Sequence, residues 1–85
     1  MEPWKLVLDE DAFQIILAGA SSSRRALLST LAELRDNPTR RPDYTTKDAT
    51  GRELSVMAVR PFLITYWLDS FVSEVRVVNI QRVRF

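Results

Sequence analysis

The sequence contains no cysteine and no histidine among its 85 residues. A disulfide framework is therefore impossible, which fits a reducing cytoplasm. The missing thiol and imidazole groups also remove the usual zinc and copper ligands, so we expect no metal centre and no cofactor. No apolar run is long enough to cross a bilayer, and Met1–Glu2 opens no basic signal region. We expect a cytoplasmic protein with no membrane partner.

Net charge is also scarce, at +1, but the charges are unevenly distributed. Residues 1–23 carry a balance of −3 and the remainder carries +4. Ten of the twelve cations are arginine, whose planar guanidinium binds phosphate and carboxylate in a bidentate way. The low net charge argues against strong nonspecific binding to nucleic acid, because such binding needs a broad basic surface.

The length and periodic patterns predict one α+β domain over residues 1–85, with a helical hairpin packed on a small antiparallel sheet. The predicted order is β-α-α-β-β-β, with one further short edge strand between the helices and the meander. The predicted strands are Trp4–Leu8, a short edge strand before the turn at Ala49–Gly51, Arg52–Val59, Phe62–Leu68 and Glu74–Val83. A second helix is predicted over Arg24–Asp36, and Asn37–Pro38 should end it.

Both predicted helices carry an apolar stripe at helical spacing. The first is capped by Asp9 and has its stripe at Phe13, Ile16, Leu17 and Ala20, which leaves Ala12, Ile15 and Gly19 on the reverse face. The second stripe is Leu27, Leu28, Leu31 and Leu34. The serines at 21–23 have no histidine to activate them and no phosphate-loop glycines, so we interpret Ser22 or Ser23 as an N-cap.

Within the sheet, Phe62–Leu68 is apolar on both faces, which predicts a central strand containing a buried Ile64. Tyr66 and Trp67 are adjacent and must point to opposite faces, so one should be buried and the other partly exposed. The last strand is ambiguous, because Val75 and Val77 favour one face while Val78 and Ile80 favour the other. Either a bulge or a buried central position would resolve this.

Four segments follow one another along the chain: Leu34–Pro38 near the second helix, Gly51–Leu54 entering the sheet, Arg60–Asp69 as a central strand ending in an acidic turn, and Glu74–Arg82 as a final strand with a terminal arginine. Together and in this order they resemble the RelE/ParE superfamily of bacterial toxins. The resemblance implies the toxin of a type II toxin–antitoxin module that forms a hetero-oligomer with a cognate antitoxin protein. ParE-like members bind DNA gyrase, and RelE-like members cleave mRNA in the ribosome.

The RelE-like branch has lysine, arginine and a C-terminal tyrosine or histidine for catalysis, whereas this chain ends in Gln81–Phe85 and carries Leu63 at the central-strand arginine position. Arginine stays protonated and is a poor general base. We therefore favour gyrase binding through Arg60, Arg76, Arg82 and Arg84, with no catalytic residue assigned. An endoribonuclease remains the alternative, as do a toxin that has lost activity and a plain peptide- or RNA-binding module.

Overall fold

The computed structural model describes residues 3–83 and has an α+β architecture of two helices and five strands. Along the chain the elements follow in the order β-α-α-β-β-β-β. This order confirms the predicted fold class. The elements are β1 (Lys5–Leu8), α1 (Glu10–Ala18), α2 (Ser21–Asp36), β2 (Tyr44–Lys47), β3 (Glu53–Val59), β4 (Phe62–Asp69) and β5 (Glu74–Arg82).

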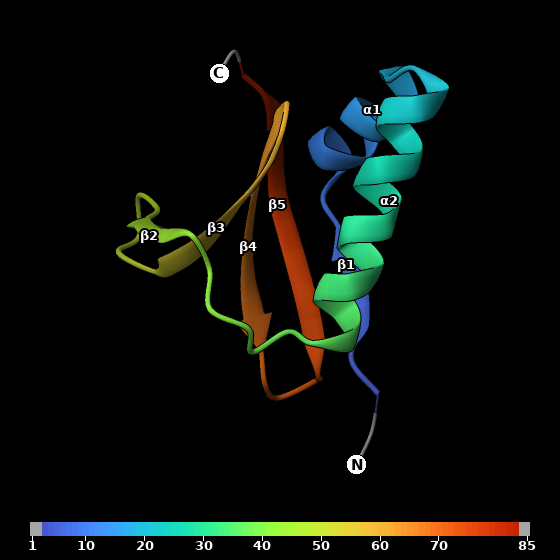
Figure 1. Cartoon of the computed structure of the whole chain (residues 1–85). Coiled ribbons are helices and arrows are strands. Elements are labelled where there is room, and N and C mark those ends of the chain that lie inside the picture. Colours follow the sequence, from blue (N-terminus) through green and yellow to red (C-terminus); the bar gives the residue numbers. More distant parts are fainter. Residues whose placement is uncertain (1–2, 84–85) are drawn as a thin grey trace.

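The strands form one sheet in the order β1-β5-β4-β3-β2, and both helices lie on one face of it (Figure 1). The β2–β3, β3–β4 and β4–β5 pairs are antiparallel, whereas β1 pairs with β5 in parallel. The sheet is therefore mixed rather than wholly antiparallel. The β4 strand is central, as its two apolar faces predicted, and the short β2 strand is an edge.

The buried face of α1 differs from the predicted stripe. Ala12 and Ile16 are buried in the core, whereas Phe13 and Leu17 are 47% and 50% exposed. Ile15 packs partly against the same core. Both sets of residues have helical spacing, so the pattern fits either face. The small Ala12 side chain lets α1 approach the sheet closely, and the larger Phe13 is left outside.

The second helix begins at Ser21, three residues before the predicted start, and Ala20 occupies its N-cap position without a side-chain hydrogen bond. The prediction of a Ser22 or Ser23 cap is therefore wrong. Arg24 instead links the two helices, because its guanidinium donates to the carbonyl oxygens of Ile16, Leu17 and Gly19 at 3.0–3.2 Å. These carbonyls lie at the C-terminal end of α1, where helical N–H partners run out, and the Ile16 oxygen also accepts from the Gly19 N–H at 3.4 Å.

A β-bulge resolves the ambiguous pattern of β5. Val77 lies opposite Tyr66 and Asn79 lies opposite Thr65, so Val78 has no partner in β4. The extra residue returns Ile80 to the face occupied by Val77. As a result, the core between helices and sheet contains all three of the fully buried β5 side chains, Val75, Val77 and Ile80. These pack with Ile64, Tyr66, Leu27, Leu31 and Leu34.

Candidate functional site

Two of the predicted site arginines lie at one end of the sheet. Arg60 is in the turn between β3 and β4, and Arg82 is the last residue of β5. Arg82 is the register partner of Phe62, and the Val83 N–H donates to the Pro61 carbonyl at 2.8 Å, so the end of β5 is held beside this turn. Both arginines are exposed. Arg84 lies outside the described residues.

Arg76 is not part of that arrangement. It is opposite Trp67 in the β4–β5 register, whereas Arg82 is opposite Phe62. Trp67 and Phe62 are five positions apart on β4 and therefore face opposite sides of the sheet. The bulge at Val78 is the cause: without it, the even-numbered separation of Arg76 and Arg82 would place both on one face. The predicted arginines therefore do not form a single cluster.

A different group forms around Trp67 on the sheet face that points away from the helices. The Arg52 guanidinium carbon lies 4.2 Å from the Trp67 ring centroid, and that of Arg76 lies 5.7 Å from it. Both distances are within cation–π range. Arg76 also donates to Glu74 Oε1 at 2.7 Å. We call Arg52, Trp67, Glu74 and Arg76 the arginine–tryptophan cluster.

Sequence reasoning identified parts of this cluster but not the cluster itself. Trp67 is partly exposed and Tyr66 is buried, as their adjacency predicted. Glu74 and Arg76 form an ion pair within β5, and Arg52 lies over the Trp67 ring. Only the β3–β4 register brings Arg52 to Trp67. The contact between Arg52 and Trp67 could have been predicted from the sequence only if the β3–β4 register had been predicted as well.

The turn between β2 and β3 positions Arg52. Asp48 Oδ1 accepts hydrogen bonds from the Thr50 N–H at 2.9 Å, the Thr50 hydroxyl at 2.6 Å and the Arg52 N–H at 3.0 Å. These bonds, that from the Thr50 hydroxyl above all, lower the pKa of the Asp48 carboxyl from its usual 3.8. Gly51 follows with a φ of +85°, a conformation that side chains disfavour. The turn thus fixes the backbone from which Arg52 projects.

A shallow pocket adjoins Arg82 on the helix side of the sheet. Its volume is about 120 Å³, and its lining consists of Ile15, Ala18, Gly19, Phe62 and Arg82. The Arg82 guanidinium carbon lies 6.0 Å from the Phe62 ring centroid, so the cation borders an otherwise apolar surface. The pocket is large enough for one apolar side chain.

The two lysines and the buried Tyr66 lie on three different strands of the sheet. Lys5 and Lys47 lie on β1 and β2, the two opposite edges of the sheet. Burial raises the pKa of the Tyr66 phenol above its usual 10, and the nearby charge of Arg40 and the Ser55 hydroxyl only partly offset this rise. Tyr66 therefore stays protonated at neutral pH. The exposed guanidinium groups of Arg60 and Arg82 are suited to binding anions.

Among residues 3–83, no group of three or more carboxylate side chains is placed to hold a metal ion. In the same range, neither helix is long and apolar enough to span a membrane.

Comparison with known proteins gives matches in structure only. No protein-family model matches the sequence, and no curated protein sequence matches it. The archaeal RelE–RelB complex of Pyrococcus horikoshii contains a chain that superimposes with a TM-score of 0.76 at 8% identity, covering 95% of this chain and 96% of that one. The RelBE2 toxin–antitoxin complex of Mycobacterium tuberculosis gives 0.75 at 13% identity, with 96% and 93% covered.

The isolated RelE toxin of E. coli gives a TM-score of 0.72 at 18% identity, with 96% of this chain and 86% of that chain covered. The similarity extends over nearly the whole of each chain, so it concerns the complete arrangement of helices and strands. At these identities it shows a shared fold, and a shared fold does not by itself establish function.

Proposed function

We propose that this chain, which has the fold of the RelE toxins, is the growth-inhibiting toxin of a type II toxin–antitoxin module in the bacterial cytoplasm. The observation that carries the proposal is the superposition over nearly the full length of three toxin chains, two of them solved in complex with their partners. A cognate antitoxin that forms a hetero-oligomer with the chain is part of the same proposal.

For the mechanism we infer inhibition by binding, with DNA gyrase as the target. The support is chemical. Arg60 and Arg82 are exposed at one end of the sheet, next to an apolar pocket of about 120 Å³. The two lysines lie at opposite edges of the sheet, away from each other. A cationic end with an apolar recess suits an acidic protein surface or a DNA-bound one, and it needs no bond chemistry of its own.

A second candidate is ribosome-dependent cleavage of mRNA. It is favoured by the comparisons, because the superimposed toxins are RelE proteins. In that reaction Arg82 and Arg60 would stabilise negative charge on the phosphate during attack by the 2′-hydroxyl. The base would have to be another residue, since arginine stays protonated and is a poor proton acceptor.

Induced expression in a bacterium tests the toxin role, and two assays with the purified chain separate the mechanisms. Gyrase binding predicts slowed growth, induction of the DNA-damage response and inhibited supercoiling, with intact mRNA in translating extracts. Cleaved mRNA with normal supercoiling would replace gyrase by the ribosome as target. Unimpaired growth with folded chain present would reject the toxin role and favour an inactive toxin or a plain binding module.

Matched variants test the site. Arg82→Ala and Arg60→Ala should each weaken growth inhibition while circular dichroism shows a preserved fold. Arg25→Ala is the control, because Arg25 is exposed on α2 and makes no side-chain hydrogen bond or ion pair in the described structure. If all three variants were as toxic as the parent chain, Arg60 and Arg82 would not contribute to the target contact.

A further inference from the structure

The arginine–tryptophan cluster is a second cationic surface that the gyrase contact does not use. It lies on the sheet face away from the helices, whereas Arg82 is on the helix side. Arg52 rests on Trp67 at 4.2 Å, and within residues 3–83 its guanidinium donates no hydrogen bond and forms no ion pair. Its five N–H donors are therefore available while its orientation is already fixed by the ring.

Such an arrangement favours binding of an anion. A guanidinium that is already ordered loses less side-chain entropy when it binds than a free arginine does. Arg76 contacts the same ring and is held by Glu74, with its side chain 37% exposed. Trp67 thus orders two cations, one from each side of β4. A carboxylate reaching both would form charge-assisted hydrogen bonds, which are about twice as strong as neutral ones.

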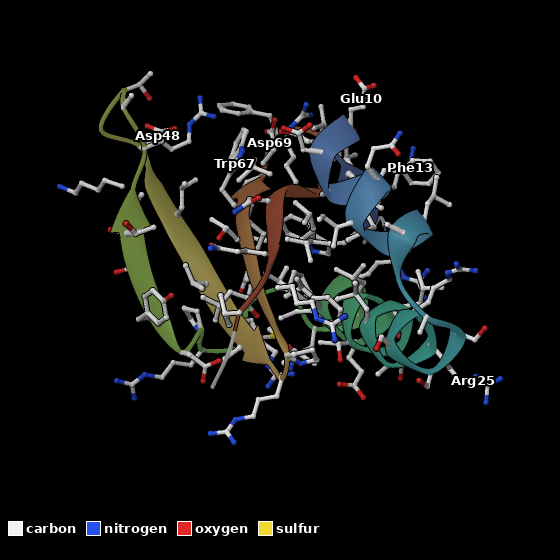
Figure 2. The ribbon with its side chains drawn as sticks, turned by 90° about the horizontal axis from the view of Figure 1, so that it is seen from above. Glu10, Phe13, Arg25, Asp48, Trp67 and Asp69 are labelled. Carbon is white, nitrogen blue, oxygen red and sulfur yellow. The ribbon has the colours of Figure 1, made fainter. Side chains whose placement is uncertain are left out.

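Exposed apolar side chains lie at the same end of the β4–β5 hairpin. Phe71 is fully exposed and Val72 is 52% exposed in the turn that joins the strands. Asp69 Oδ1 accepts a hydrogen bond from the Phe71 N–H at 3.2 Å, which orders this turn. Asp69 and Glu74 are register partners two positions from Trp67 and Arg76, so the turn adjoins the cluster. In Figure 2, Trp67 and Asp69 lie close together, while Arg25 is on the far side of the molecule.

We infer that the arginine–tryptophan cluster, together with Phe71, binds an acidic and apolar segment of the antitoxin. A carboxylate of that segment lies against Arg52 and Arg76, and a neighbouring apolar side chain packs on Phe71. The inference rests on the proposed toxin role, because that role supplies the antitoxin. The proposed docking surface is separate from the end of the sheet that carries Arg60 and Arg82. An antitoxin segment bound to the cluster therefore does not cover these two arginines.

The charges around the cluster favour a peptide over a nucleic acid. Glu74 lies within the cluster, Asp69 is two residues along β4 from Trp67, and Asp48 is bonded to the Arg52 N–H. A phosphate backbone would bring one negative charge per nucleotide past these carboxylates. A single carboxylate flanked by apolar side chains meets the two arginines and avoids that repulsion. The exposed Phe71 gives the apolar residues a contact that a sugar–phosphate chain cannot use.

Fluorescence anisotropy with the purified full chain tests the inference. The probe is a fluorescein-labelled peptide of alternating aspartate and leucine residues. Three matched probes accompany it: the same peptide with asparagine for aspartate, the same peptide with serine for leucine, and single-stranded RNA of equal length. The protein variants are Arg52→Gln, Arg76→Gln and Phe71→Ser, with Arg25→Gln as control.

The aspartate–leucine peptide should bind more tightly than the other three probes. Arg52→Gln and Arg76→Gln should each weaken its binding about tenfold, the equivalent of about 1.4 kcal/mol. Phe71→Ser should weaken it as well, whereas Arg25→Gln should leave it unchanged. Added salt should reduce the affinity, because the contact is partly exposed. In the unsubstituted chain, the indole N–H signal of Trp67, identified by its loss in Trp67→Phe, should shift on titration while that of Trp4 does not.

Three results would overturn the inference: no binding of the aspartate–leucine peptide, an equal loss in Arg25→Gln, or RNA binding that depends more strongly on Arg52 and Arg76. The growth assay distinguishes this failure from failure of the proposed function. A chain that inhibits growth but shows any of these three results remains a toxin without this docking surface. A chain that binds the peptide as expected but leaves growth unimpaired has the peptide-binding surface and no toxin role, and the antitoxin assignment then falls.

Discussion

Replacing Ile64 by alanine should remove a large part of the stability of this domain. Ile64 is fully buried on β4, where it lies between Met57 of β3 and Ile80 of β5. The change deletes the ethyl and methyl branches beyond Cβ. Their transfer to water costs roughly 2.4 kcal/mol at about 0.8 kcal/mol for each carbon group. Since strands flank Ile64 on both sides, the space cannot collapse fully, and a residual cavity of roughly 60 Å³ adds about 1.4 kcal/mol.

The expected loss of about 4 kcal/mol is large for a chain of this length, because domains of 85 residues have unfolding free energies of roughly 4–13 kcal/mol. Equilibrium urea unfolding followed by circular dichroism measures it as a lowered midpoint. Leu28→Ala is the control, because Leu28 is 47% exposed on α2 and its truncation should cost less than about 1 kcal/mol. An Ile64→Ala midpoint equal to that of the parent would refute the central position of this side chain.

Three further predictions concern single polar groups. Tyr66→Phe should stabilise the chain by about 1 kcal/mol in urea unfolding, because it removes a buried hydroxyl that has no hydrogen-bond partner in the described structure; a clear loss would reveal a bond to that hydroxyl. Arg24→Ala should cost about 1–2 kcal/mol, because the carbonyl oxygens of Ile16, Leu17 and Gly19 lose the guanidinium as a donor, while Arg25→Ala should cost nothing measurable; equal effects would contradict the link. The folded-state pKa of Asp48 is lowered, so its ionised carboxylate stabilises the turn fully above pH 3.8 and loses this effect as the pH falls through the folded-state pKa. The difference in unfolding free energy between the parent and Asp48→Asn should therefore shrink in that range of pH. A difference that stays constant with pH would exclude a role for the charge.

The sequence was sufficient to predict most of the secondary structure, because the signals for it are local. Asn37–Pro38 ends α2, since a residue before proline avoids helical geometry. Gly51 marks the turn before β3, where it adopts a φ of +85°. The two apolar faces of Phe62–Leu68 predicted a central strand, and the sheet order confirms it. The parallel pairing of β1 with β5 was not predicted, because it joins segments about 70 residues apart with no local signal.

The face of α1 was predicted wrongly for a physical reason. Two overlapping sets of residues have the spacing of a helical stripe, and the more apolar set contains Phe13 and Leu17. Close packing against the sheet instead selects the set with the small side chain of Ala12. Hydrophobicity along the chain measures the transfer of each side chain from water, and it contains no information on how closely two elements can approach. That distance is a property of the assembled core.

The sequence by itself determined the helices, the strands, the central position of β4 and the presence of many arginines. Only the tertiary structure decided which arginines are neighbours. One unpaired residue, Val78, turns the end of β5 over, so that Arg76 lies beside Trp67 on the open face and Arg82 lies beside Phe62 on the helix side. The side chains of a strand alternate with a period of two residues, so a single bulge exchanges the faces of everything that follows it. Such a change depends on the partner strand, and the local sequence left it open.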